Sequence, residues 1–105
     1  MRVLPAIIVL GLGAGAAIGA EFDVRQAKKA FMPERLSVAK GSVVNFANDE
    51  KFVHHAFVDS PQFAADTGDI PPGEARRIVF TKAGTFVVHC AIHPSMKMTV
   101  EVSEE

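Results

Sequence analysis

Apolar and polar residues alternate with a period of two along most of the chain after residue 20. In the stretch 75–80, Ile78 and Phe80 fall on one side, while Arg77 and Val79 fall on the other. Such alternation is typical of a β-strand with one face on a core. The same pattern predicts strands at 22–26, 36–41, 42–47, 52–58, 75–80, 85–90 and 98–102.

Turn-forming residues separate these segments. Polar residues cluster at 48–51, and proline and glycine interrupt the chain at 70–73 and 82–84. Short strands with a turn signal about every eight to twelve residues predict an all-β sandwich with Greek-key connections, here of seven to eight strands. Residues 60–69 are the least regular, and we expect a short helix over 62–66 or only a loop there.

The first twenty residues have a different pattern. Arg2 is followed by a run, 3–20, that has no charge, is rich in glycine and alanine, and ends Ala17-Ile-Gly-Ala20. This is typical of a secretory signal peptide cleaved after Ala20, with a second possible site at Ala14-Gly-Ala16. An uncleaved membrane anchor is the alternative, because the run is about the minimum length for a span. The domain itself is then expected to cover residues 21–105.

Composition sharpens this picture. Removing 20 residues from the chain of 105 leaves 85, a length at which the core is thin and a disulfide or metal often stabilises the fold. The single cysteine excludes a disulfide within the chain, and an exported free thiol needs an explanation that metal binding supplies. Without Arg2, ten Lys and Arg face twelve Asp and Glu. This balance argues against nucleic acid or an anionic membrane surface as a partner.

The run Cys90-Ala-Ile-His93-Pro-Ser-Met96 carries the candidate chemistry. It places a thiolate, an imidazole and a thioether at intervals of three residues. Two imidazoles, one thiolate and a weak axial thioether form the blue-copper ligand set, and His54 or His55 can supply the second imidazole. Successive residues of a strand point to opposite faces, so only one of these two histidines can bind the same ion.

Other interpretations of these residues stay open. A cysteine within a strand is often only a small core residue, although the spacing of His93 and Met96 favours a metal. Zinc would bind Cys and His but has no use for a thioether, and a binuclear copper centre would need a second cysteine. His89 adjoins Cys90 and should point the other way, as an exposed strand residue.

Several segments together resemble the cupredoxin family, and among its members amicyanin and the bacterial plastocyanin-like copper proteins most closely. The resemblance covers 31–102 and rests on Phe31-x-Pro33, Val43-Val-Asn-Phe-Ala-Asn48, His54, Pro72-Gly73-Glu74, Ala83-Gly84-Thr85-Phe86 and Cys90-x-x-His93-Pro94-x-Met96. It implies an eight-stranded Greek-key sandwich with copper at one end.

The resemblance also assigns roles to single residues. It makes His54 the buried equatorial imidazole, Cys90 the equatorial thiolate, His93 the imidazole nearest solvent and Met96 the axial thioether. The chain departs from the family at two positions. His55 stands where relatives usually have asparagine, and Met98 stands where they often have glycine, which makes Met98 a rival axial ligand.

The function expected on this basis is electron transfer by one type 1 copper ion. The resemblance implies a monomer that shuttles single electrons between a donor and an acceptor redox protein in transient encounters, in the periplasm or otherwise outside the cytoplasm. It also implies that the electron passes through His93, within an apolar rim that includes Val53 and Pro94. A periplasmic copper carrier or storage protein with the same ligands is the alternative. An enzyme is not expected, because four protein donors leave no open position on the metal.

Overall fold

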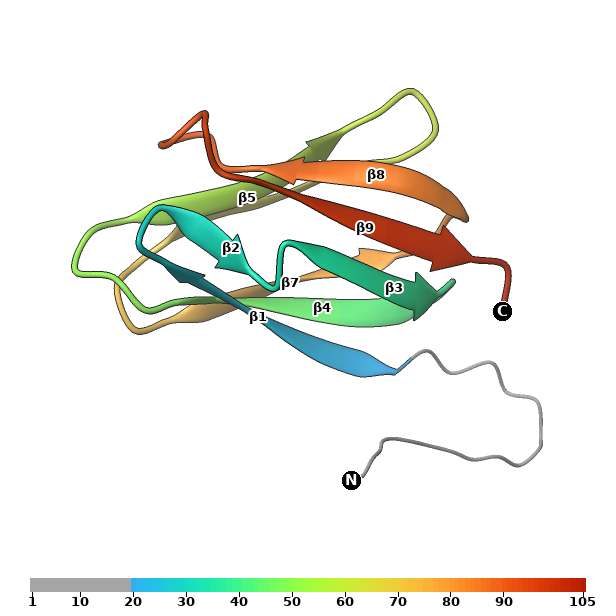
Figure 1. Ribbon diagram of the computed structural model, residues 1–105, viewed down its shortest axis with the longest axis horizontal. Helices are drawn as coiled ribbons and strands as arrows, with labels where there is room; N and C mark the ends of the chain where they lie inside the picture. The colour runs from blue at the N-terminus through green and yellow to red at the C-terminus, as the bar shows by residue number, and fades with distance from the viewer. Residues whose placement is uncertain (1–19) are drawn as a thin grey trace.

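Nine β-strands form the described part of the chain, residues 20–105 of the computed structural model (Figure 1). They are β1 Glu21–Ala27, β2 Ala30–Met32, β3 Arg35–Ala39, β4 Ser42–Asn48, β5 His54–Asp59, β6 Ala64–Ile70, β7 Ala75–Phe80, β8 Gly84–His89 and β9 Lys97–Ser103. Within residues 20–105, no helix has the length and apolarity needed to cross a membrane. The predicted signal segment, except for Ala20, lies outside the described residues.

The strands form two mixed sheets that face each other. One sheet has the order β2-β1-β4-β7 and the other has the order β3-β9-β8-β5-β6. The pairs β1–β4 and β3–β9 are parallel, and the other pairs are antiparallel. This arrangement confirms the all-β sandwich that the alternation predicts.

Two of the nine strands were not among the predicted segments. Strand β2 has only three residues, too few to show a pattern. The short helix or loop expected over 62–66 is wrong, because β6 begins at Ala64 and pairs along β5 as an edge strand. Pairing with a neighbour thus decides the conformation of a segment whose alanine, aspartate and glycine residues have little preference for strands.

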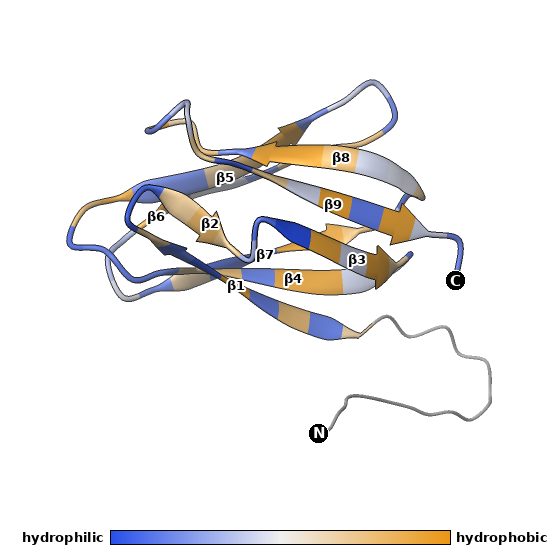
Figure 2. Cartoon of the chain, viewed as in Figure 1, coloured by the Kyte–Doolittle hydropathy of each residue, from blue (hydrophilic) through white to orange (hydrophobic). Residues whose placement is uncertain are grey.

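Alternating side chains from both sheets fill the space between them. Ile78 and Phe80 are buried and Val79 is exposed, as the alternation predicts. The core also contains Phe46 and Phe86, and Phe46 meets Phe31 edge to face with ring centroids 5.9 Å apart. Apolar and polar bands alternate along strands such as β9 (Figure 2).

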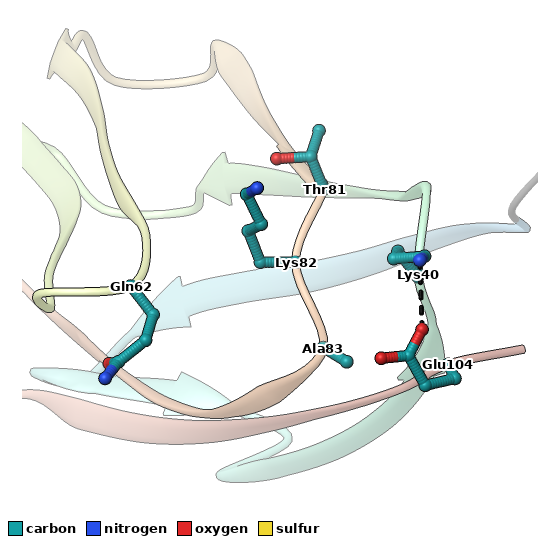
Figure 3. A pocket seen from close by; sticks show the side chains of 6 residues that line it. All are labelled: Lys40, Gln62, Thr81, Lys82, Ala83 and Glu104. Carbon is teal, nitrogen blue, oxygen red and sulfur yellow. Dashed lines mark hydrogen bonds and ion pairs between the residues drawn. The ribbon is translucent and has the colours of Figure 1, made fainter.

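The connections gather at the two ends of the sandwich (Figure 1). The β4–β5, β6–β7 and β8–β9 connections lie at one end. Three of the predicted ligands come from the β8–β9 connection, and His54 directly follows the β4–β5 connection. At the other end is a recess of about 490 Å³, lined by Lys40, Gln62, Thr81, Lys82, Ala83 and Glu104 (Figure 3). Lys40 Nζ pairs with Glu104 Oε1 at 2.9 Å there, and none of the lining residues is a histidine, cysteine or methionine. The recess is therefore separate from the candidate site.

Candidate metal centre

His54 and Cys90 meet at the end of the sandwich although they lie 36 residues apart in sequence. His54 is the first residue of β5, and Cys90 directly follows β8, the strand beside β5 in the sheet. His54 is 0% exposed and Cys90 is 1% exposed. The distance from His54 Nδ1 to Cys90 Sγ is 3.7 Å. The structure therefore brings together two of the four predicted site residues in a buried, water-poor position.

The loop between β8 and β9 carries the other two predicted residues. The Met96 backbone N–H donates to the His93 carbonyl at 2.9 Å, and the Cys90 N–H donates to the Met96 carbonyl at 3.3 Å. These two bonds turn the loop back on itself and leave Met96 only 1% exposed. His93 is half-buried, and its ring centroid lies 5.2 Å from that of His54.

Burial sets the protonation state of His54. Desolvation of the ring, followed by the nearby His93, lowers the pKa of His54 below the ordinary histidine value. Glu50 opposes this effect, but its Oε1 lies 3.8 Å from His54 Nε2, too far for a good hydrogen bond. Nε2 has no hydrogen-bond partner within residues 20–105. His54 is thus neutral near pH 7, which is the form that binds a metal.

The separation of the two donors suits a shared metal ion. Metal–sulfur and metal–nitrogen bonds of about 2.3 and 2.0 Å, at an angle of about 120°, place sulfur and nitrogen about 3.7 Å apart. That is the distance between Cys90 Sγ and His54 Nδ1. A thiolate and imidazoles next to a thioether form a donor set suited to copper. Across residues 20–105, however, no three His, Cys, Asp or Glu side chains form a complete metal-holding group. The His54–Cys90 pair is close together without a metal, and all four predicted residues are ligands only as a proposal.

The neighbouring histidines lie elsewhere. His55 points away from His54, toward Asp66 and Asp69 of β6. Of the two consecutive histidines, His54 therefore faces the sulfur, although its role as a ligand stays a prediction. His89 was expected to be exposed. It is instead half-buried, because its ring stacks on Phe57 at a centroid distance of 5.4 Å.

Asn48 organises the loop that precedes His54. Its side-chain amide donates to the carbonyls of Phe52 and Ile70 at 2.8 and 2.9 Å, and its Oδ1 accepts the Glu50 N–H at 2.8 Å. In the sequence, Asn48 stands out only as the end of a motif of the family resemblance and the start of a polar turn. Asn48 lies on the same face of β4 as the buried Val44 and Phe46, where an amide needs several hydrogen-bond partners. This position is the signal that could have indicated its role.

An exposed apolar rim surrounds His93. The Phe52 ring lies 5.4 Å from the His54 ring and 5.5 Å from the His93 ring, measured between centroids. Phe52 is 44% exposed and Ile92 is 43% exposed. Of the two predicted rim residues, Val53 is half-buried and Pro94 is exposed. Phe52 was not among the predicted rim residues, and its only signal in the sequence is its place between the polar cluster 48–51 and Val53.

Comparisons with known proteins match this architecture. The family model described as a cupredoxin-like domain matches residues 3–102. Plastocyanin of Capsella bursa-pastoris is 31% identical over 85 residues, which cover 70% of this chain and 86% of that protein. A Cu(I) structure of an amicyanin variant superposes with a TM-score of 0.72 at 29% identity, over 85% of this chain and 87% of the other.

An enzyme also contains a similar domain. A copper-containing nitrite reductase from Thermus scotoductus SA-01 superposes with a TM-score of 0.73 at 31% identity. The match covers 91% of this chain but only 25% of the reductase, so the chain spans about a quarter of that enzyme's length. The family match over nearly the whole chain, together with the two-sheet sandwich, shows that this protein belongs to the cupredoxin family.

Proposed function

We propose that this protein binds one type 1 copper ion and carries single electrons between redox proteins. The observation that supports it most is the buried pair of Cys90 Sγ and His54 Nδ1, 3.7 Å apart in a cupredoxin sandwich. His54, Cys90 and His93 are the proposed equatorial ligands, and Met96 is the proposed axial ligand. The uncharged apolar run before residue 21 supports a role outside the cytoplasm.

When bound, copper supplies a one-electron couple between Cu(I) and Cu(II). The protein supplies soft sulfur, which Cu(I) favours, and imidazole nitrogen, which suits Cu(II). Burial of His54, Cys90 and Met96 keeps water from the donor atoms. The two backbone hydrogen bonds of the 90–96 loop hold the donors in place before any ion binds. Four protein donors leave no position for a substrate, so we propose a carrier of electrons and not an enzyme.

Redox cycling against a copper chelator tests this function directly. We expect the copper-loaded protein to keep its metal through repeated reduction and reoxidation, because three of the four proposed ligands are buried. Free and bound copper would be measured after each cycle, together with the visible spectrum. Transfer of the metal to the chelator at each reduction would instead favour a copper carrier or storage protein.

The exposed apolar rim is the proposed point of electron exchange, because weak and small interfaces suit transient redox encounters. We expect Ile92→Glu to slow electron self-exchange between the Cu(I) and Cu(II) forms about tenfold, equivalent to about 1.4 kcal/mol. Two copies meeting through this rim would bring like charges together. NMR line broadening in mixtures of the two forms measures this rate without a natural partner.

Val79→Glu is the matched control for this measurement. Val79 is 41% exposed, close to the 43% of Ile92, but it lies on β7 in the other sheet. The control should leave the self-exchange rate close to that of the native protein, and neither change should alter the colour. Equal slowing by both variants would show that net charge, and not the rim, controls the rate.

A further inference from the structure

His55 connects two strands on the outer face of the five-stranded sheet. Its Nδ1 faces Asp69 Oδ1 at 3.1 Å, and its Nε2 faces Asp66 Oδ1. Both aspartates belong to β6, the edge strand. The Gly68 N–H also donates to Asp66 Oδ1 at 2.7 Å and lowers the pKa of Asp66, so this partner remains a carboxylate. One side chain of β5 therefore faces a carboxylate of β6 at each of its two ring nitrogens.

The main-chain pairing between these strands is irregular at this point. Their register shifts between His55 and Phe57. Between these two residues, the Ala56 N–H donates to the Thr67 hydroxyl at 3.1 Å. On β6, Thr67 and Gly68 lie opposite the single Ala56 of β5. Such an extra residue interrupts the ladder of backbone hydrogen bonds and bends the strand that carries it. Backbone pairing still joins His54 to Ile70 and His55 to Asp69, and the side-chain bonds of His55 add to the attachment of β6 to β5 beside the irregular point.

The pairing of β5 with β8, on its other side, is short. Only Phe57–His89 and Val58–Val88 pair in register. The Phe57 ring stacks on His89 at 5.4 Å with an interplanar angle of 28°, and the His55 ring meets Phe57 edge-on at 6.3 Å. A row of contacts thus crosses β6, β5 and β8 on the outer face. It passes from the two aspartates through His55 and Phe57 to His89.

This row lies directly behind the candidate metal centre. His55 follows His54 in the chain, and His89 precedes Cys90. The side chains of the row point outward, while those of His54 and Cys90 are buried on the opposite face. A shift of β5 against β8 would therefore change the separation of the two inner donors, and β6 restrains β5 from its other side.

We propose that His55, held by Asp66 and Asp69, is a positioning residue that fixes His54 relative to Cys90. This inference rests on the copper site proposed above. Without the side-chain bonds, the irregular pairing of β5 with β6 is free to relax, and the histidine donor is held less tightly. The geometry of the donors sets the energies of the thiolate-to-copper transitions and the balance between Cu(I) and Cu(II).

Optical and redox measurements on three variants test this role. We expect His55→Ala to change the intensity ratio of the visible bands and to shift the ratio of Cu(II) to Cu(I) affinity at least threefold. His55→Gln, whose amide can still bond one aspartate, should recover part of both changes. Glu101→Ala is the matched control, because it breaks the bonds of Glu101 to Arg35 and Ser37 at the far edge of the same sheet. It should leave spectrum and potential unchanged.

Hydrogen exchange in the metal-free protein gives a second readout. We expect His55→Ala to speed exchange of the amides in 54–58 and 65–70 at least tenfold, with little change in the β8–β9 pair. A native protein that stays colourless with copper would refute the proposed function, and the exchange result would still decide whether His55 holds β5 to β6. If His55→Ala matches the native protein in exchange, spectrum and potential, the positioning role is wrong.

Discussion

The Cys90→Ser protein is expected to lose the visible colour that copper gives the native protein, together with most of the stability that copper adds. A serine hydroxyl has nearly the shape of the thiol but remains protonated and is a poor copper ligand. The thiolate is also the donor for the strong visible absorption, and the chain has only this one cysteine. Titration with Cu(II), followed by visible spectroscopy and calorimetry, measures both losses.

The size of the stability effect follows from binding linkage. An ion that binds only the folded state at a thousand times its dissociation constant adds about 4 kcal/mol of unfolding free energy. For a domain of this size, that corresponds to a rise in melting temperature of roughly 15 °C or more. We expect the native protein to show this rise and Cys90→Ser to show less than a quarter of it.

A substitution in the same loop provides the control. Ser95 is exposed between His93 and Met96, so Ser95→Ala should keep both the colour and the copper-dependent rise in melting temperature. Because Cys90 is 1% exposed, a buried hydroxyl there should lower the stability of the metal-free protein by about 1–3 kcal/mol. A strongly coloured Cys90→Ser protein would remove Cys90 from the proposed ligand set.

The fold was predictable where one face of a strand is buried. Ile78 and Phe80 alternate with exposed residues, and this local pattern survives in the structure. Strand β6 could not be found in this way, because the sequence Ala-Ala-Asp-Thr-Gly-Asp-Ile has no sustained apolar alternation. Its conformation comes from pairing with β5, a contact that no local pattern encodes.

The candidate site likewise has local features that the sequence shows and long-range contacts that it does not show. The spacing of Cys90, His93 and Met96 is local, so the sequence alone indicates their common loop. Alternation shows that His54 and His55 face opposite ways, but only the packing of β5 shows which of them faces the sulfur. The bonds of Asn48 to the β4–β5 loop and to Ile70 depend on loop closure between distant strands. No local pattern in the sequence encodes these bonds.

Met96 and Met98 are the two candidates for the axial ligand, and the axial ligand tunes the reduction potential of a blue-copper site. Met98 pairs in register with Val88 within β9 and is 2% exposed among core residues. Met96 precedes β9, in the loop that its backbone bonds close against Cys90 and His93. Burial is equal at the two positions, so exposure cannot separate them. The loop position is the one that favours Met96.

Met96→Leu is therefore expected to raise the reduction potential while the protein stays coloured. Loss of the thioether removes a donor and leaves three equatorial ligands, which favours the lower coordination number of Cu(I). A tenfold change in the ratio of Cu(I) to Cu(II) affinity corresponds to about 59 mV for one electron, and we expect at least that shift. Voltammetry of the copper-loaded protein measures it.

Met98→Leu makes the same chemical change two residues away. A leucine of similar volume should cost less than about 1.5 kcal/mol of stability at this core position and leave the potential near its native value. If Met98→Leu shifted the potential and Met96→Leu did not, the axial role would belong to Met98. The ligand loop would then extend into the first residues of β9. The backbone bonds between Met96, His93 and Cys90 argue against this, because they turn the chain back before the strand begins.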